Sequence, residues 1–524
     1  MKKLFLLLWF FIGLLYLGLV NQYWTPEWDS AYFIEIARSI VTGQGYTYLG
    51  YPVLKVPFGF PLLLSPIVWL FDINFLLMNF LIVLCSLGSI LATYWLFNQF
   101  FTKKYSILIT VLTAFSYLMV RRSTYIQSDV PYMMFSLLAL IYINRYLRYE
   151  KLYRNGILAG MLIVVSYFLR PVGISILFGT LIYLFAEKNI RFKAKKVALI
   201  LLIVILPLVA WNVRNQTVKI DPKDPVWQLQ EFTSYHQEYM RAEWKEHMSE
   251  RITPLKMLLR ITKNTMYYTG HSSGLILGQK SVLMLGLNEL NTVSKPLLIL
   301  MGFIALVIVA GYGMSLFSKK YFFDWYVLCY LGIIFLISAR ETRYLLPILP
   351  FIFHYFFTGA HWFMKKAFPI TMKKYHVPVL AIFVIYFICS NLLIDIEIVK
   401  SQHRTPFYSE RDQNFMNSID WVKNNTSKES KIISVHSPVV VFLSGKWSVT
   451  FPWIEDQYML LDFFSKVEAE YLILSPAQGN NQSYLLPLIE DNPPLFQLLY
   501  SSGEAKVYQI NRSILSEKLD EMKK

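Results

Sequence analysis

Charged side chains with the types needed for acid–base chemistry and anion binding stand at the ends of apolar segments. They are Glu27, Asp29, Lys55, Asp129, Arg170 and Arg343. Carboxylates can accept a proton from a substrate hydroxyl group, and Lys and Arg side chains can bind an anionic group. If the apolar segments bring these residues to one face of a membrane, they predict the active site of a membrane-embedded enzyme.

The composition is typical of a protein that crosses a membrane many times. Hydrophobic residues make up 55% of the chain, aromatic residues 17% and charged residues only 16%, with a mean hydropathy of +0.42. Segments long enough to cross about 30 Å of hydrocarbon recur up to residue 395. We expect about eleven spans, near residues 3–20, 74–98, 105–120, 130–147, 156–170, 171–187, 197–213, 294–317, 322–339, 344–363 and 376–395. The segment 58–71 is shorter and predicts an interfacial or half-inserted helix.

The positive charges predict the orientation of the spans. With a cytoplasmic N-terminus and an uncleaved anchor at 1–20, short cytoplasmic loops hold 19 Lys and Arg residues. The loops 21–73 and 212–293 and the turns 121–129 and 340–343 then face outward. The net charge of +16 follows from this topology, and no basic face of a soluble domain predicts nucleic-acid binding. We expect a multi-pass protein of the bacterial plasma (inner) membrane.

The C-terminal part, residues 399–524, is more polar than the transmembrane part, residues 1–398. Short β-rich runs at 431–435, 439–443 and 471–474 alternate with a helical pattern near 455–467, which predicts a small α/β domain. The odd number of spans places this domain outside the cytoplasm. A lid or docking domain is the simplest interpretation, because no motif there carries chemistry.

Several short motifs, in their order along the chain, resemble one known family. They are Trp28-Asp29-Ser-Ala-Tyr32, Lys55-Val-Pro57, Ser128-Asp129, Leu169-Arg170-Pro171, Trp211-Asn212 and Arg343-Tyr344-x-x-Pro347-x-x-Pro350. Together they are similar to the GT-C superfamily of membrane glycosyltransferases, in the branch of the protein O-mannosyltransferases and the lipid A aminoarabinose transferase. The resemblance implies an all-α polytopic membrane protein that takes a sugar from a polyprenyl-phosphate donor. The implied acceptor is a lipid, glycan or protein at the outer face of the membrane.

The resemblance also implies roles for individual residues. Asp29 matches the loop carboxylate that acts as general base or orients the acceptor, and Asp129 matches the second acidic position. Lys55 matches the lysine that meets the lipid phosphate, and Arg343 matches the basic residue of the late Arg-Tyr motif. Many members carry two adjacent acids in the first loop, whereas Glu27 is separated from Asp29 by one residue, so the role of Glu27 stays open.

The chemistry of sugar transfer places demands on these groups. Desolvation at a membrane interface would raise the pKa of a catalytic carboxylate toward a useful range. Lys55, Arg343 and Arg170 would neutralise the leaving phosphate. The first isoprene units of the donor would lie against Phe58, Phe60 and Trp69. The resemblance leaves the need for a divalent metal open.

Structural roles compete with each functional assignment. Asp29 could cap a helix over Ala31–Ile40, and Asp129 could cap the following span. Lys55 could extend to the interface as an ordinary snorkelling lysine, and Arg343 could belong to a structural ion-pair cluster with Arg340 and Glu341. The spacing of His236, His247 and His271 in the long outer connection indicates no metal site.

Two other classes of protein remain open at this point. A lipid or polysaccharide transporter would need ionisable residues near the middle of its spans, which are nearly free of them. A non-catalytic membrane scaffold would explain the polar C-terminal domain and would leave the outer acids and bases without a use.

Overall fold

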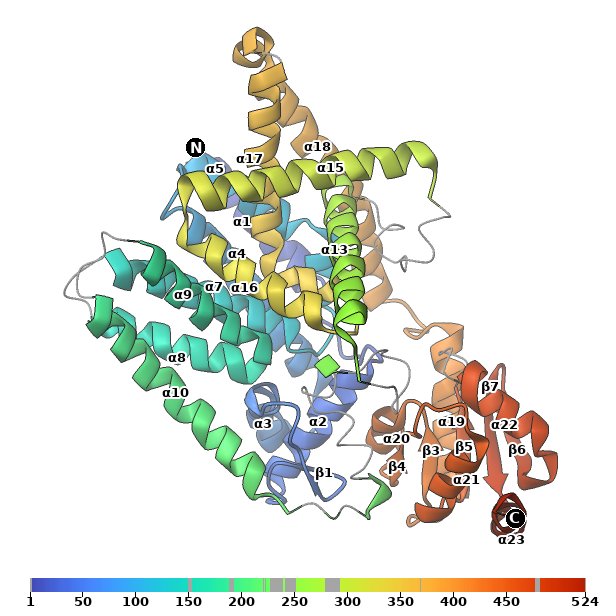
Figure 1. Cartoon of the computed structure of the whole chain (residues 1–524). Coiled ribbons are helices and arrows are strands. Elements are labelled where there is room, and N and C mark those ends of the chain that lie inside the picture. Colours follow the sequence, from blue (N-terminus) through green and yellow to red (C-terminus); the bar gives the residue numbers. More distant parts are fainter. Residues whose placement is uncertain are drawn as a thin grey trace.

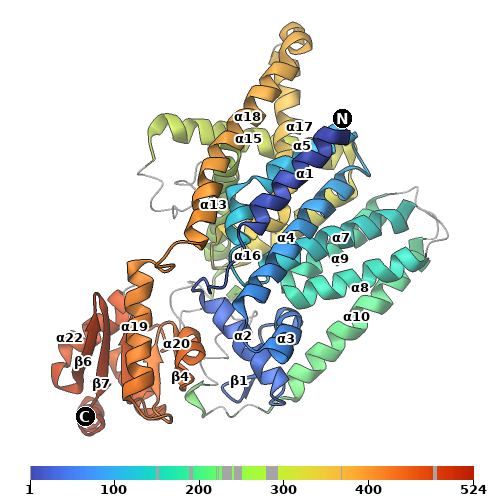
Figure 2. The same cartoon turned by 180° about the vertical axis from the view of Figure 1, so that it is seen from behind.

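The computed structural model consists of a large helical body and a smaller α/β domain at its side (Figures 1 and 2). It describes residues 2–523 except 149–152, 188–192, 220, 222, 227–238, 241–250, 279–292, 368 and 476–480. Predicted positions in these gaps, including His236, His247 and most of the helical pattern at 226–247, lie outside the described residues. The mainly helical architecture with a C-terminal α/β domain is as predicted.

A helix lies at the position of every apolar segment that was predicted to span. These helices are α1 (Lys2–Leu17), α4 (Phe75–Phe97), α5 (Lys103–Ala114), α7 (Asp129–Arg148), α8 (Tyr153–Leu169), α9 (Ile174–Ala186), α10 (Lys193–Thr217), α15 (Lys295–Met314), α16 (Phe322–Leu336), α17 (Leu349–Ala367) and α18 (Pro369–Gln402). Among the described residues, five helices are long and apolar enough to cross a membrane: α4, α7, α10, α15 with the turn after it, and the second part of α18. The chain is therefore described as a multi-pass membrane protein, and the number of eleven spans stays a prediction.

Interruptions between helices fall beside the charged residues of interest. Arg170 is extended, with φ −150° and ψ 129°, between α8 and the short 3₁₀ helix η1 (Pro171–Gly173). The residue before a proline avoids the helical region, so Pro171 ends α8 at this point. A second 3₁₀ helix, η4 (Thr342–Ile348), joins α16 to α17 and carries Arg343. The predicted span 105–120 is also broken, into α5 and α6 (Tyr117–Arg122).

The loop after α1 folds into two short helices and a hairpin. They are α2 (Trp28–Val41), β1 (Thr47–Tyr48), β2 (Tyr51–Pro52) and α3 (Gly59–Phe71). The amide of Asn79, in α4, donates to the carbonyl oxygens of Asn21 and Tyr23 at 2.9 Å each and so fixes the start of this loop. The helix predicted at 58–71 is present as α3, and its place at a membrane interface stays a prediction.

The long connection between α10 and α15 contains a further helix, α13 (Pro254–Leu277). It packs against α15 and α16, and the Asn264 side chain donates to the carbonyl oxygens of Phe335 and Ile337 at 2.8 Å each. The predicted helical pattern at 254–268 is thus part of a longer helix that lies along the helical body (Figure 1). Its end at Leu277 is followed by Gly278 in the left-handed conformation, φ +64°.

The C-terminal domain has a five-stranded sheet in the order β4-β3-β5-β7-β6. Strands β3, β4 and β5 are parallel, and β7 runs antiparallel to both β5 and β6. The elements are α19 (Glu410–Asn425), β3 (Ile432–Ser434), α20 (Ser437–Ser444), β4 (Ser448–Val449), α21 (Gln457–Lys466), β5 (Tyr471–Leu474), α22 (Leu486–Asp491), β6 (Phe496–Ser502), β7 (Ala505–Ile510) and α23 (Arg512–Met522). The predicted domain boundary at 398/399 falls inside α18.

One predicted β-rich run is wrong. Residues 439–443 belong to the helix α20, although Val439, Val440 and Val441 favour strands. Pro438 lies in the first turn, where its fixed φ suits a helix, and Gly445 ends the helix with φ +69°. The run is buried almost throughout, so packing rather than strand propensity decides its conformation.

Helix α20 docks the C-terminal domain on the loop that carries Asp29. The ring of Phe442 packs edge-on against Trp24, with centroids 5.2 Å apart, and also contacts Phe75 at 6.0 Å. Trp28, the first residue of α2, packs against His436 at 6.2 Å. Trp24, Phe75 and Phe442 belong to one hydrophobic core, which continues from the helical body into the domain. In both views α20 lies beside α2, so the domain directly supports the first turn of that helix (Figures 1 and 2).

Candidate functional site

Asp29 lies in the first turn of α2 and forms an ion pair with Arg343. The Oδ2 atom of Asp29 is 2.7 Å from Nη1 of Arg343, although the two residues are 314 positions apart in the sequence. The predicted capping role of Asp29 is wrong: α2 begins at Trp28 and its N-cap is Glu27, which makes no side-chain capping bond. The Asp29 side chain therefore points toward Arg343 and does not cap the start of the helix.

Asp129 and Arg170 form a second ion pair beside the first. Asp129 is the first residue of α7, its side chain is only 3% exposed, and Nη1 of Arg170 donates to its Oδ1. The second carboxylate oxygen, Oδ2, is 4.0 Å from Nη1 of Arg343 and accepts no hydrogen bond within the described part of the chain. Two acids and two guanidinium groups thus alternate in one network.

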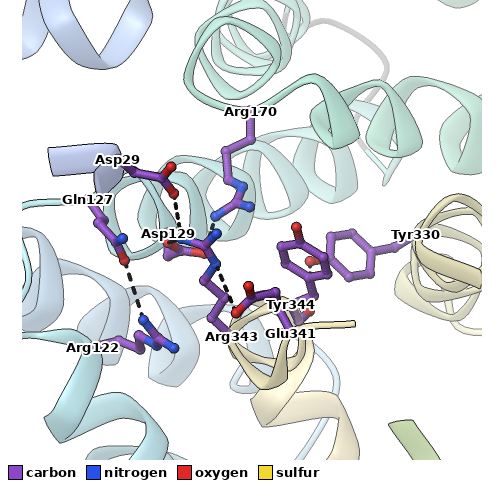
Figure 3. A network of polar contacts seen from close by, with 9 residues as sticks. All are labelled: Asp29, Arg122, Gln127, Asp129, Arg170, Tyr330, Glu341, Arg343 and Tyr344. Atoms are coloured by element: carbon purple, nitrogen blue, oxygen red, sulfur yellow. Dashed lines mark hydrogen bonds and ion pairs between the residues drawn. The ribbon is translucent and has the colours of Figure 1, made fainter. Parts of the chain in front are cut away.

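Arg343 is the centre of the network (Figure 3). Its side chain is 13% exposed, and its Nε lies 3.7 Å from Glu341. The Tyr344 ring contacts both guanidinium groups, with Cζ of Arg170 at 5.3 Å and Cζ of Arg343 at 5.8 Å from the ring centre. The Tyr330 hydroxyl donates to the Tyr344 carbonyl oxygen at 2.8 Å, which holds η4 in place. The structure therefore joins the four residues Asp29, Asp129, Arg170 and Arg343 predicted from separate segments.

Glu27 and Lys55 lie at the edge of this network. Lys55 is half-buried and its charge helps to lower the pKa of Asp29. Glu27 is half-buried, and its electrostatic neighbours are Asp29, Arg343, Arg122 and Glu341. Both residues act on the four-residue centre through their charges and so flank it.

The two acids of the first loop have pKa values shifted in opposite directions. Desolvation by the surrounding protein would raise the pKa of Asp29, but the charge and hydrogen bond of Arg343, aided by Arg170 and Lys55, bring it below the ordinary value. Desolvation, followed by repulsion from Asp29, raises the pKa of Glu27. The predicted upward shift is therefore wrong for Asp29 and correct for Glu27, because Asp29 alone has a guanidinium partner at bonding distance.

The predicted apolar surface for the donor lipid is only partly present. Phe60 is fully buried, while Trp69 is 71% exposed, and Phe58 stacks on Phe168 with ring centres 4.4 Å apart. These three side chains therefore do not form one surface. An apolar pocket instead lies between α13, α15, α16, α17 and η4, lined by Tyr268, Ile308, Val327, Leu345, Ile352 and Tyr355 among others. It begins next to the network, because Leu345 directly follows Tyr344.

A further group of side chains lies together near the network, and the sequence did not predict this grouping. Arg122, at the end of α6, donates to Oε1 of Gln127 at 3.4 Å. The Tyr125 ring lies under the guanidinium groups of both Arg121 and Arg122, at 4.9 and 5.3 Å. The turn 121–129 was noted for its charges, but nothing in the sequence indicated that Gln127 is buried beside them.

The described residues provide no obvious metal site. They contain no group of three or more His, Cys, Asp or Glu side chains that could hold a metal ion. Asp29 and Asp129 are each engaged by a guanidinium group. His271 is buried in α13, with Nδ1 2.8 Å from the Tyr267 carbonyl oxygen. The residues of the network therefore fit an anionic ligand better than a divalent cation.

Comparisons with known proteins agree with this architecture. Residues 55–211, from Lys55 through Asp129 and Arg170, match the model of the dolichyl-phosphate-mannose-protein mannosyltransferase family. The structure of ArnT from Cupriavidus metallidurans bound to undecaprenyl phosphate is similar, with a TM-score of 0.57 and 10% identity over 97% of this chain and 98% of that one. A comparison with curated proteins finds no match.

Archaeal structures share the same fold. The oligosaccharyltransferase of Archaeoglobus fulgidus, in a complex with Zn and sulfate, has a TM-score of 0.55 and 12% identity, covering 96% of this chain and 72% of that one. The same enzyme, AglB, with an inhibitory peptide and a dolichol-phosphate has a TM-score of 0.50 at 11% identity, over 98% of this chain and 75% of that one. The chain thus has the fold of the GT-C glycosyltransferases and resembles the ArnT and protein mannosyltransferase branch, which confirms the predicted resemblance.

Proposed function

We propose that this protein is a membrane glycosyltransferase that moves a sugar from a polyprenyl-phosphate donor to an acceptor hydroxyl group. One observation supports this most strongly: the Asp29 carboxylate is paired at 2.7 Å with the Arg343 guanidinium, beside the Asp129–Arg170 pair. A proton acceptor and cations for a phosphate are thus within a few ångströms of each other. The family match over residues 55–211 and the shared fold support the same reaction class.

In the proposed reaction the acceptor oxygen attacks the anomeric carbon of the donor sugar. The new C–O bond forms as the bond from the anomeric carbon to the phosphate oxygen breaks, and the phosphate keeps the electron pair. Asp29 takes the acceptor proton as general base. Arg343, Arg170 and Lys55 stabilise the charge that develops on the leaving polyprenyl phosphate, and Arg side chains can do so through two N–H groups.

The Asp29–Arg343 pair gives this reaction a built-in order. While Arg343 holds Asp29, the lowered pKa of the carboxylate makes it a weak base. A donor phosphate that binds Arg343 competes for the guanidinium and weakens its hold on Asp29. The basicity of Asp29 then rises only when the donor is in place, which favours transfer to the acceptor over proton abstraction in an empty site.

The donor lipid needs an apolar path away from the phosphate site. The pocket between α13, α15, α16 and α17 starts at Leu345, two residues after Arg343, and its described lining is almost entirely apolar. An isoprenoid chain placed there would gain about 25 cal/mol for each Å² of apolar surface removed from water. This pocket is a better candidate for the first isoprene units than the surface around α3, where Phe60 is already buried.

We further propose that the site faces away from the cytoplasm in a plasma (inner) membrane. The positive charges of the short loops support a cytoplasmic N-terminus, with Asp29, Asp129, Arg170 and Arg343 at the opposite end. Because α20 contacts α2, the C-terminal domain would lie on the same side as the site. A cysteine introduced at exposed Ser501 should react with a membrane-impermeant maleimide in intact spheroplasts, and one at exposed Lys103 should not.

The transporter alternative receives little support from the buried acids. The spans are less free of ionisable residues than expected, because Asp324 in α16 and Asp395 in α18 are fully buried. Asp324 accepts hydrogen bonds from Ser315 and Tyr355, which indicates a structural role. Both residues lie nearer the ends of their helices than the middle: Asp324 is the third residue of α16, and Asp395 is seven residues before the end of α18.

The proposed function is tested by the lipid-linked sugars of cells that lack the protein. Mass spectrometry should find one sugar-bearing polyprenyl phosphate that accumulates, and wild-type protein should relieve the accumulation. Asp29→Asn, which keeps the size of the side chain, should insert and fold yet fail to relieve it, since loss of a general base costs a factor of about 10²–10⁴. An unchanged lipid pool would refute the transferase, and full rescue by Asp29→Asn would refute Asp29 as the base.

A further inference from the structure

A second set of cationic groups lies beside the catalytic network and has no carboxylate partner. Arg121 and Arg122 are half-buried at the end of α6, and both guanidinium groups lie over the Tyr125 ring, at 4.9 and 5.3 Å. Neither makes an ion pair within 4.0 Å in the part of the chain that the structure describes. Arg170 and Arg343, in contrast, are both neutralised by acids at bonding distance.

Gln127 supplies independent evidence for a ligand at this place. It is only 2% exposed, and its Oε1 accepts a hydrogen bond from Nη1 of Arg122. Since a guanidinium group can only donate, this bond fixes the orientation of the amide. The Nε2 group then has no acceptor among the described residues. A buried donor without an acceptor is destabilising, because it has lost its hydrogen bonds to water, so the arrangement favours a ligand that offers an oxygen atom.

The position of this set relative to Asp29 indicates which substrate it serves. In the view of Figure 3, Arg122 and Gln127 lie on one side of Asp29, and Arg170 lies on the other. Arg122 lies close enough to Glu27, two residues before Asp29, for its positive charge to oppose the rise in the pKa of Glu27. The donor phosphate is assigned to Arg170, Arg343 and Lys55. The acceptor must present its hydroxyl group at Asp29 and therefore extends toward the remaining donors.

We propose that Arg121, Arg122 and Gln127 bind an anionic group of the acceptor, a phosphate or a carboxylate, close to the hydroxyl group that receives the sugar. This inference rests on the proposed glycosyl transfer and adds the chemical class of its acceptor. Two guanidinium groups and a primary amide are all hydrogen-bond donors, and charge-assisted bonds to an anion are roughly twice as strong as neutral ones. The amide adds selectivity for an oxygen at a fixed position.

The test uses the full-length protein in proteoliposomes with a radiolabelled polyprenyl-phosphate sugar. Envelope lipids and glycans from cells that lack the protein are separated by anion exchange into neutral and acidic fractions. We expect transfer of label only into the acidic fraction. Arg122→Gln should raise the KM for that fraction at least tenfold and leave the KM for the donor unchanged. Gln127→Glu, which keeps the size of the side chain and adds a negative charge, should do the same.

Arg145→Gln is the matched control. The guanidinium group of Arg145 lies over the Tyr142 ring at 5.5 Å, much as that of Arg122 lies over Tyr125. Arg145, however, is exposed and lies near the C-terminal end of α7, away from Asp129 at its start. This variant should keep both KM values. Phosphatase treatment of the acidic fraction identifies the group: loss of acceptor activity indicates a phosphate, and retention indicates a carboxylate.

Three results would overturn the inference. Transfer into the neutral fraction would show that the acceptor needs no anion, while the transferase itself would stand. An increase in the donor KM with an unchanged acceptor KM in Arg122→Gln would assign this set to the donor instead. Label transfer into neither fraction would reject the proposed function together with the acceptor class.

Discussion

Replacement of Arg343 by Gln should change the pH dependence of the reaction as well as its rate. Arg343 lies 2.7 Å from Asp29 and holds its pKa below the ordinary value. Two unit charges 4 Å apart interact by about 4 kcal/mol at the surface of a protein and by about 1 kcal/mol in water. The Asp29 side chain is 41% exposed, so screening by solvent keeps the interaction between these two values, about 1 and 4 kcal/mol.

The loss of this interaction should shift the acidic side of the pH–rate profile. Because Arg343 holds the pKa of Asp29 below its ordinary value, the loss of Arg343 should raise that pKa. A general base must be deprotonated, and its activity is lost as the pH falls through its pKa. The acidic limb of kcat/KM, which reports the free enzyme, should therefore move to higher pH.

The same reasoning predicts a smaller shift in the pH dependence of kcat. In the proposed complex with the donor, the phosphate would already occupy Arg343 in the wild-type protein, so Asp29 would have lost part of this interaction before the substitution. The rate itself should fall by about 10²–10³, as for the loss of one donor to a developing oxyanion. The assay is transfer from a radiolabelled polyprenyl-phosphate sugar, measured over the acidic range at varied donor concentration.

Arg38→Gln provides the control for this experiment. Arg38 forms a 2.6 Å ion pair with Glu35 on the same helix, α2, but it lies outside the network. Its substitution should leave the pH profile unchanged. If Arg343→Gln lowers the rate while the acidic limb stays at the wild-type position, Arg343 does not govern the protonation of the base, and the assignment of Asp29 is refuted.

Two further predictions concern stability. Arg170→Gln leaves Asp129, whose side chain is 3% exposed, as a buried carboxylate without its partner and should lower the free energy of unfolding by about 3–5 kcal/mol. Thermal unfolding in detergent should show that adding Asp129→Asn to the same chain recovers part of this loss. Equal stability of the single and the double variant would contradict the pair. Burial, with the nearby charge of Arg411, lowers the pKa of His436 to about 4. The unfolded chain then binds more protons, so stability should fall by up to about 3 kcal/mol as the pH drops from about 6.5 to 4. His436→Gln should remove this pH dependence in the unfolding of the C-terminal domain, and a wild-type slope in the variant would refute the assignment.

The sequence predicts the helical body well because its signal is strong and local. A span needs a continuous apolar run, and such runs are visible without any knowledge of their neighbours. The predicted segments at 74–98 and 130–147 correspond to α4 and α7 within a residue or two. Where the run is interrupted by a polar residue, as at Ser116, the prediction missed the break between α5 and α6.

The C-terminal domain was harder to predict because its elements are short and depend on packing. Val439–Val441 have the composition of a strand but form a helix between the sheet and the loop that holds Trp24. The hairpin of β6 and β7 was missed altogether. Its alternation is weak, with Leu498 exposed at 51%, and a register shift interrupts the pairing near Leu498.

The structure brings four of the predicted site residues together, but their pairing could not be predicted from the sequence. The sequence places Asp29, Asp129, Arg170 and Arg343 at the ends of apolar segments, and the structure brings all four together. Which acid meets which guanidinium depends on the packing of helices far apart in the chain. The direction of the pKa shift of Asp29 follows from that pairing, so it was also beyond prediction.

The separation of Asp29 and Arg343 along the chain has a consequence for biosynthesis. At about 5–20 residues per second, a ribosome needs about 15–60 s to add the 314 residues between them. Asp129, in contrast, is followed by Arg170 after only 41 residues, so its partner is made within seconds. A nascent chain therefore carries an unpaired Asp29 through most of its insertion, and the two halves of the site meet only when the last helices join the bundle. Until that moment the proposed active site is incomplete.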